Sequence, residues 1–283
     1  MEPHHYTPPR DLIDAFGRQR FYQTARAERP IFIFASGERC GSTLIQRLLC
    51  THPDIFIWGE QHGALTYLWS FYLTATEHAL QNEKVGELFV EGGTAKFIAN
   101  LSPGISAIKN ATRAAIRTLY GGFADRWGCK EVRCGVDVAG LIAELFPKSK
   151  IVFLVRHVSA CLASLMRWEY DLAACKGFVD RWTILAEEMT RLQNSNLPQA
   201  ILLRYEDFIV KPLASTKSLC SFLDIDISGL DLDTFKLRIA DHSNVELVEK
   251  VKPRTAMPLP PEVKALTQTD NVREVLSLLK YNI

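Results

Sequence analysis

Apolar residues along the chain fall into short continuous runs, and longer stretches with helical spacing separate these runs. The runs are apolar without alternation, which predicts strands buried on both faces at Ile31–Ala35, Ile151–Val155 and Ile201–Leu203. Helical spacing predicts helices near Leu65–Leu80, Ile105–Leu119, Val136–Phe146 and Phe178–Leu192. Because strands and helices alternate, the chain is expected to be an α/β protein with a parallel β-sheet and helices on both faces.

A loop rich in small residues follows the first predicted strand. Residues 36–41 would let backbone N–H groups approach an anion, and helical spacing resumes directly afterwards, with Leu44, Ile45, Leu48 and Leu49 on one stripe. An oxyanion would then lie at the positive end of that helix. The predicted sheet is therefore P-loop-like.

The loop differs from the nucleotide kinase loop G-x-x-x-x-G-K-[ST]. Ser42 follows Gly41 with no Lys between them, and the cation, Arg39, precedes the glycine. The kinase Lys reaches the outer phosphates of a triphosphate beside Mg²⁺, whereas Arg39 would lie on the other flank of the loop. The loop therefore favours a phosphate-binding enzyme other than a kinase, and a metal-dependent P-loop small-molecule kinase remains the alternative.

Length and composition favour one large domain. The 283 residues contain no linker and are 47% hydrophobic, so we expect a single domain over residues 1–283 with an N-terminal extension at 1–28. The 33 Lys and Arg residues nearly balance 32 Asp and Glu, which argues against a nucleic acid partner. No segment has the apolar length of a signal peptide or a membrane span, so we expect a cytoplasmic protein.

Cysteine usage is consistent with the expected cytoplasmic location, where thiols stay reduced. The seven cysteines are an odd number spread through predicted helices and strands, which favours reduced core thiols over a disulfide framework. Cys129 and Cys134 are the nearest pair, but their spacing does not fit a zinc knuckle and no second pair lies at ligand spacing. We expect no metal site.

A second candidate anchor for an anion follows the second predicted strand. Arg156 lies at the strand end, and Ser164 follows eight residues later within a helix. Ligands of parallel sheets bind beyond the carboxyl ends of the strands, which places Arg156 and residues 36–41 on one rim. Taken alone, both residues could be ordinary surface residues, but two anchors in this order make a phosphate site the better interpretation.

These two segments resemble the sulfotransferases that use 3′-phosphoadenosine 5′-phosphosulfate (PAPS). The order basic residue, small residue, Gly, Ser, Thr resembles their 5′-phosphosulfate loop, and the strand-end Arg with Ser164 resembles their 3′-phosphate segment. A third match runs from Leu202 to Ile225 and contains the sequence YED, which implies that Tyr205 lies near the adenine. The resemblance spans about residues 31–255. Within it, the pattern is most similar to that of the tyrosylprotein and carbohydrate sulfotransferases and their bacterial relatives.

The resemblance implies in-line transfer of a sulfuryl group from PAPS to a hydroxyl or amine, with a carboxylate as general base and adenosine 3′,5′-bisphosphate (PAP) as product. Glu60 matches the family's Gly-Glu and is the first candidate base, with His62 as the alternative. Lys130 resembles the lysine that stabilises charge on the leaving oxygen, and with Arg39 it would form an electrostatic clamp.

The resemblance also implies a set of cofactor-binding residues. They are Arg39, Cys40, Gly41, Ser42, Thr43, Leu44, Arg156, Ser164, Tyr205, Ser243 and Lys252. Arg167 is one position out of register with a phosphate-binding Arg of close relatives, and Glu131 with Val132 departs from the family pattern after Lys130.

Residues 61–125 are expected to form a helical insertion on the acceptor side. This segment contains Tyr67, Trp69, Phe71, Tyr72 and Phe89, and aromatic walls suit a small-molecule, carbohydrate, lipid or peptide acceptor equally. The acceptor and the oligomeric state stay open. A noncatalytic nucleotide-binding protein that retains the cofactor cleft is a further alternative.

Overall fold

A computed structural model describes residues 28–82, 102–195, 197–239, 245–247 and 258–281. Its centre is a five-stranded sheet in the order β2-β3-β1-β4-β5, with every neighbouring pair parallel. The strands are β1 (Ile31–Ala35), β2 (Ile55–Trp58), β3 (Arg126–Glu131), β4 (Lys150–Val155) and β5 (Ala200–Arg204). A separate antiparallel pair joins β6 (Leu237–Ile239) to β7 (Val245–Leu247).

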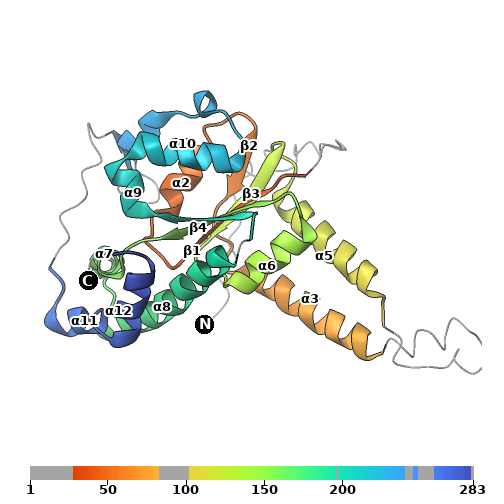
Figure 1. The fold of residues 1–283 in the computed structure, drawn as a ribbon, viewed down its shortest axis with the longest axis horizontal. Helices are drawn as coiled ribbons and strands as arrows, with labels where there is room; N and C mark the ends of the chain where they lie inside the picture. The colour runs from red at the N-terminus through yellow and green to blue at the C-terminus, as the bar shows by residue number, and fades with distance from the viewer. Residues whose placement is uncertain (1–27, 83–101, 196, 240–244, 248–257, 282–283) are drawn as a thin grey trace, which may run out of the picture.

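Helices cover both faces of the sheet, as the sequence predicts. The longer ones are α2 (Ser42–Leu49), α3 (Ala64–Gln81), α5 (Ile105–Tyr120), α6 (Val136–Leu145), α7 (Val158–Leu165), α8 (Leu172–Asn194), α10 (Pro212–Leu223) and α12 (Asp270–Leu278). Shorter ones are α9 (Tyr205–Val210), α11 (Pro261–Leu266), η2 (Met166–Trp168), η3 (Ile227–Gly229) and η4 (Leu232–Lys236). Figure 1 shows α2, α9 and α10 on one side of the sheet and α6 and α8 on the other. The predicted fold class is confirmed.

The core is built on the two central strands that the apolar runs predict. Every residue of β1 is fully buried, and only Lys150 of β4 is partly exposed. Parallel strands covered by helices on both faces need such continuous apolar runs. The predicted helices also form, each within a few residues of its expected bounds except for α8, which begins six residues earlier than Phe178.

Strands β2 and β3 are absent from the sequence prediction, and this is a correction to it. All six residues of β3 are buried although Arg126, Lys130 and Glu131 are ionisable. Gly128 in its middle allows the close approach of β1, because a Cβ there would lie 1.7 Å from the Ile31 carbonyl oxygen. A strand carrying three charges does not produce an apolar run, so the pattern alone does not reveal it.

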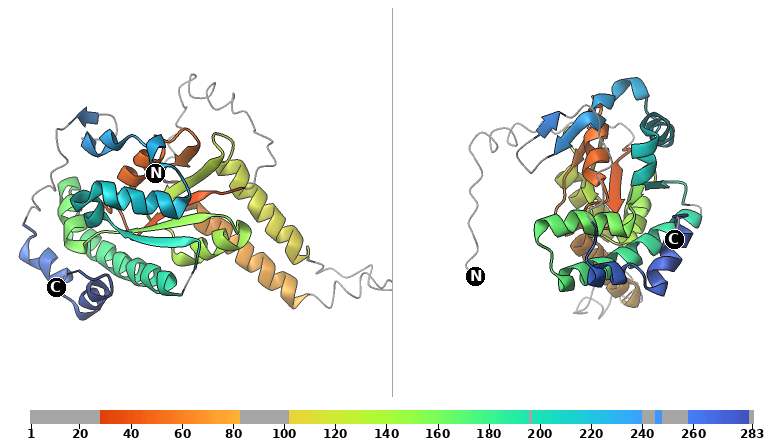
Figure 2. Two further views of the ribbon diagram at one scale, coloured as in Figure 1. Left: turned by 45° about the horizontal axis from the view of Figure 1, so that its top comes forward. Right: turned by 90° about the vertical axis from the view of Figure 1, so that its left-hand side faces the viewer.

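Helices α3 and α5 pack against each other and project from one side of the molecule (Figure 2). On α3, Tyr67 and Phe71 are exposed, whereas Tyr72 is buried and donates from its hydroxyl to Glu144 Oε1 at 2.8 Å. Phe89, like nearly all of the 1–28 extension, lies outside the described residues. The role of residues 61–125 on the acceptor side therefore stays a prediction.

No helix within the described ranges is both long and apolar enough to cross a membrane. All seven cysteines are free thiols. In the described part of the chain, no group of three or more His, Cys, Asp or Glu side chains is arranged to hold a metal ion.

Candidate active site

The loop between β1 and α2 has the geometry of an anion-binding turn. Gly41 stands directly before α2 with a left-handed backbone (φ 89°), and no side chain of the described residues caps the helix. The first amides of a helix have no intrahelical acceptor, so those of Ser42 and Thr43 are available to an anion. A Cβ on Gly41 would also lie 2.2 Å from Cδ2 of Tyr205, so glycine is required here for two reasons.

The two predicted anchors converge on this loop. Arg156, directly after β4, donates from Nη1 to the Arg39 carbonyl oxygen at 2.8 Å. Arg39 in turn donates from Nε to Ser164 Oγ at 3.0 Å. The Arg156 guanidinium also lies over the Tyr205 ring, 4.5 Å from its centroid. Arg156 and the amides beside Gly41 therefore belong to one cluster at the carboxyl ends of β1, β4 and β5.

Positive charge gathers at this cluster without a carboxylate to neutralise it. Among the described residues, no Asp or Glu forms a salt bridge with Arg39, Arg156 or Arg167. Partial desolvation, followed by the charges of Arg156 and Arg167, lowers the pKa of the Arg39 guanidinium, and the charge of Glu60 opposes this shift. Like charges held together in this way are stabilised by an anion between them.

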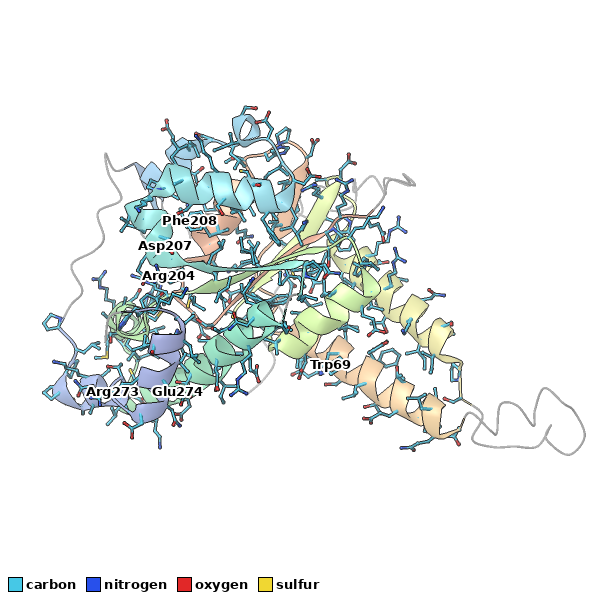
Figure 3. All side chains as sticks on the ribbon, viewed as in Figure 1. Trp69, Arg204, Asp207, Phe208, Arg273 and Glu274 are labelled. Atoms are coloured by element: carbon cyan, nitrogen blue, oxygen red, sulfur yellow. The ribbon has the colours of Figure 1, made fainter. Side chains whose placement is uncertain are left out.

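The YED sequence after β5 joins three parts of the rim. Tyr205 packs against Arg156 and Gly41, as described above. Glu206 accepts from the His157 backbone N–H at 3.0 Å and from the Tyr281 hydroxyl at 2.7 Å. Asp207 receives two hydrogen bonds from the Arg204 guanidinium at 2.9 and 3.0 Å, and Figure 3 shows both side chains at the β5–α9 junction. This motif therefore links the strand ends to the C-terminal segment.

A second cluster of charges surrounds the candidate base. Glu60 lies in the loop between β2 and α3, and Oε1 accepts from Nζ of Lys130 at 2.5 Å. Its other oxygen, Oε2, accepts from Nη1 of Arg133 at 3.1 Å. The Lys130 side chain is only 6% exposed, whereas that of Glu60 is 30% exposed. The carboxylate is thus oriented by two cations and remains reachable from solvent.

Glu131 fixes the loop that carries Glu60. This fully buried carboxylate accepts from the Gln61 backbone N–H at 2.6 Å and from that of Gly63 at 3.3 Å. Both amides stand at the start of α3, where a negative charge is favoured by the helix dipole. The departure from the family pattern at Glu131 therefore has a structural reason.

Replacing Glu131 with Gln is expected to lower the free energy of unfolding by about 2 kcal/mol. The amide has one acceptor oxygen, and its NH₂ would face backbone N–H donors in a buried position. Guanidinium unfolding followed by circular dichroism measures the change. Glu187→Gln, which removes an exposed ion pair with Arg191, is the control, with an expected cost of about 0.3–0.5 kcal/mol. Equal stability of the two variants would contradict this role of Glu131.

Other candidate residues lie in varied positions. Cys40 is buried, its Sγ 3.3 Å from Ser36 Oγ and 3.7 Å from Cys161 Sγ, so it faces the core and only its backbone could meet a ligand. His62 is exposed, two residues beyond Glu60, and Thr43 is exposed on the first turn of α2. Leu44 is partly buried behind the loop.

Some predictions about the site are not settled by this geometry. Ser243 and Lys252 lie outside the described residues. The expected clamp of Arg39 with Lys130 stays a prediction, because Arg39 donates to Ser164 while Lys130 is paired with Glu60.

Sequence reasoning missed four residues that contact this site. Arg133, Glu38 and Arg181 continue the charge cluster from Glu60, and Tyr281 binds Glu206 from the C-terminal segment. Glu38 lies inside the loop itself, so a carboxylate in an anion-binding turn was the available signal.

Comparison with known proteins gives a consistent result. Residues 30–229 match the model of the sulfotransferase family. The protein-tyrosine sulfotransferase of Drosophila melanogaster is 25% identical over 213 residues, which cover 73% of this chain and 40% of that relative. The chain thus spans less than half the length of the fly protein.

Solved structures share the fold at low sequence identity. The sulfotransferase domain of the olefin synthase of Synechococcus PCC 7002 superposes with a TM-score of 0.57 at 18% identity, covering 93% of this chain and 99% of that domain. The sulfotransferase domain of the curacin biosynthetic pathway gives a TM-score of 0.50 at 18% identity, covering 92% of this chain and 100% of that domain. Since the family model covers most of the chain, this protein belongs to the sulfotransferase family.

Proposed function

We propose that this protein transfers the sulfuryl group of PAPS to a hydroxyl or amine of an acceptor, with Glu60 as general base. The observation that carries the proposal is the convergence of Arg39, Arg156 and Ser164 with the start of α2 on one rim. Arg133 links this rim to the Glu60–Lys130 pair, because it forms ion pairs with Glu60 and with Glu38 of the phosphate-binding loop.

The residues present fit a bisphosphorylated adenosine. Guanidinium groups fork onto phosphate oxygens, and Arg156 Nε is buried without a hydrogen-bond partner among the described residues. Backbone amides at the start of α2 suit the phosphosulfate, and Arg156 with Ser164 suits the 3′-phosphate. The ring of Tyr205, which lies beside Gly41 and Arg156, offers a surface for the adenine.

When bound, PAPS supplies the sulfuryl group and the departing PAP. Glu60 would accept the proton of the acceptor hydroxyl as the new S–O bond forms, while the S–O bond to the phosphate breaks. Lys130, buried next to Glu60, would place its positive charge on the leaving oxygen. This chemistry demands no metal ion.

The acceptor class is open to a direct screen. The similarity to a protein-tyrosine sulfotransferase makes a tyrosine peptide the first acceptor to try. Simple phenols, sugars and hydroxylated lipids complete the panel, since the expected acceptor is a small molecule, carbohydrate, lipid or peptide.

Calorimetric titration with PAP in the presence of EDTA tests the cofactor assignment. We expect micromolar or tighter binding of PAP and at least tenfold weaker binding of adenosine 5′-phosphate, because the latter lacks the 3′-phosphate for Arg156 and Ser164. Absence of PAP binding would overturn the proposal. An ATP-consumption assay with Mg²⁺ tests the kinase alternative in the same preparation.

A further inference from the structure

The charge cluster around Glu60 extends into the phosphate-binding loop. Arg133 donates from Nη1 to Glu60 Oε2 at 3.1 Å, and its Nη2 forms an ion pair with Glu38 Oε1 at 3.3 Å. Glu38 also receives Arg181 Nη2 at 2.6 Å on its second oxygen. One continuous chain of ion pairs thus includes the candidate base and runs in the order Lys130, Glu60, Arg133, Glu38 and Arg181.

The position of Glu38 is unusual for an anion-binding loop. It lies between Gly37 and Arg39, where a carboxylate opposes the binding of phosphate unless cations neutralise it. Its side chain is only 16% exposed, and Arg133 and Arg181 occupy both oxygens. Its charge is therefore balanced by two arginines before any anion binds.

The two cations that bind Glu60, Lys130 and Arg133, are expected to behave differently during the reaction. Under the proposed function, Lys130 serves the leaving oxygen, so its hold on Glu60 must loosen as that oxygen gains charge. Arg133 has no such task, and its fork holds one carboxylate with each terminal nitrogen. Arg133 is therefore the partner that keeps Glu60 oriented while Lys130 interacts with the leaving oxygen.

We propose that Arg133 and Glu38 are positioning residues: Arg133 aims the Glu60 carboxylate at the acceptor, and Glu38 holds Arg133 in place from the phosphate-binding loop. This inference rests on the proposed function, because it assigns Glu60 the role of base. A base held by a second group, which is itself held by a third, is a recurring arrangement in proton-transferring sites.

Arg133→Gln is expected to reduce the rate of sulfuryl release from labelled PAPS roughly tenfold to a hundredfold, measured with water and with the acceptor panel. The affinity for PAP, measured by calorimetry, should stay within about threefold of the wild type, because both terminal nitrogens of Arg133 are engaged by Glu60 and Glu38. Arg191→Gln, which removes an exposed Arg–Glu pair on α8, should change neither quantity.

Two further variants separate positioning from simple structural support. Arg133→Lys should recover part of the lost rate, since one ammonium can hold Glu60 but cannot hold Glu38 at the same time. Glu38→Gln should lower the rate in the wild-type background and have no additional effect in Arg133→Gln, because it acts through Arg133. Multiplicative losses in the double variant would overturn the role of Glu38.

The outcomes distinguish this inference from the proposed function. A wild-type protein that does not bind PAP contradicts the proposed function itself. Suppose instead that the wild type binds PAP and transfers sulfuryl groups, and that Arg133→Gln and Arg133→Lys are as active as the wild type. That result contradicts only the positioning role. If Arg133→Gln loses its circular dichroism signal, the comparison is made between Arg133→Lys and the wild type.

Discussion

Glu60→Gln is expected to lower the rate of sulfuryl transfer by about 10² to 10⁴, the usual contribution of a positioned general base. The amide keeps the size of the side chain and can still accept a hydrogen bond from Lys130 or Arg133, but it cannot take the acceptor proton. Binding of PAP should persist or become a few times tighter, since the substitution removes a negative charge that raises the pKa of Arg39. Transfer of labelled sulfuryl groups and PAP calorimetry measure the two effects.

The same experiment decides between the base and its alternative. His62→Ala should leave the rate near that of the wild type, because His62 is exposed and is not held by the cations that orient Glu60. If Glu60→Gln transfers at the wild-type rate and His62→Ala does not, the histidine is the base. The noncatalytic alternative is favoured if the wild type and Glu60→Gln both bind PAP but the wild type transfers no sulfuryl group to any acceptor.

The fold could be predicted where burial leaves a simple pattern. Strands β1 and β4 carry continuous apolar runs because helices cover both of their faces. Strand β3 lies equally deep but breaks the pattern, since distant partners satisfy its charged residues. Arg126 donates to the Leu223 and Asp224 carbonyl oxygens, and Lys130 pairs with Glu60. Those partners are distant in sequence, so no local window contains the information.

The candidate site shows the same division. Residues adjacent to a strand end, such as Arg156 and Gly41, could be placed on one rim from topology alone. The contacts of Arg133 with Glu60 and Glu38 could not, because they join loops after β3, β2 and β1, and the order of β2 and β3 in the sheet was not predicted. Pairing between loops follows from strand order, which the sequence leaves open when two strands are missed.

Arg156→Ala is expected to weaken PAP binding about a hundredfold, or roughly 2.7 kcal/mol, the scale of a charge-assisted fork onto a phosphate. The substitution removes the guanidinium, frees the Arg39 carbonyl oxygen and leaves the Tyr205 ring without its cation. Arg156→Lys keeps the charge but loses the fork, so we expect about a tenfold loss. Calorimetry with PAP gives all three affinities.

Adenosine 5′-phosphate is the sharper control for Arg156, because it retains the 5′ end and lacks the 3′-phosphate. If Arg156 holds the 3′-phosphate, Arg156→Ala should bind this ligand nearly as well as the wild type does, and the preference for PAP should disappear. An equal loss for both ligands would mean that Arg156 acts through its bond to the Arg39 carbonyl, by shaping the loop that receives the 5′ end. The ratio of the two affinities therefore separates a phosphate ligand from a support of the phosphate-binding loop.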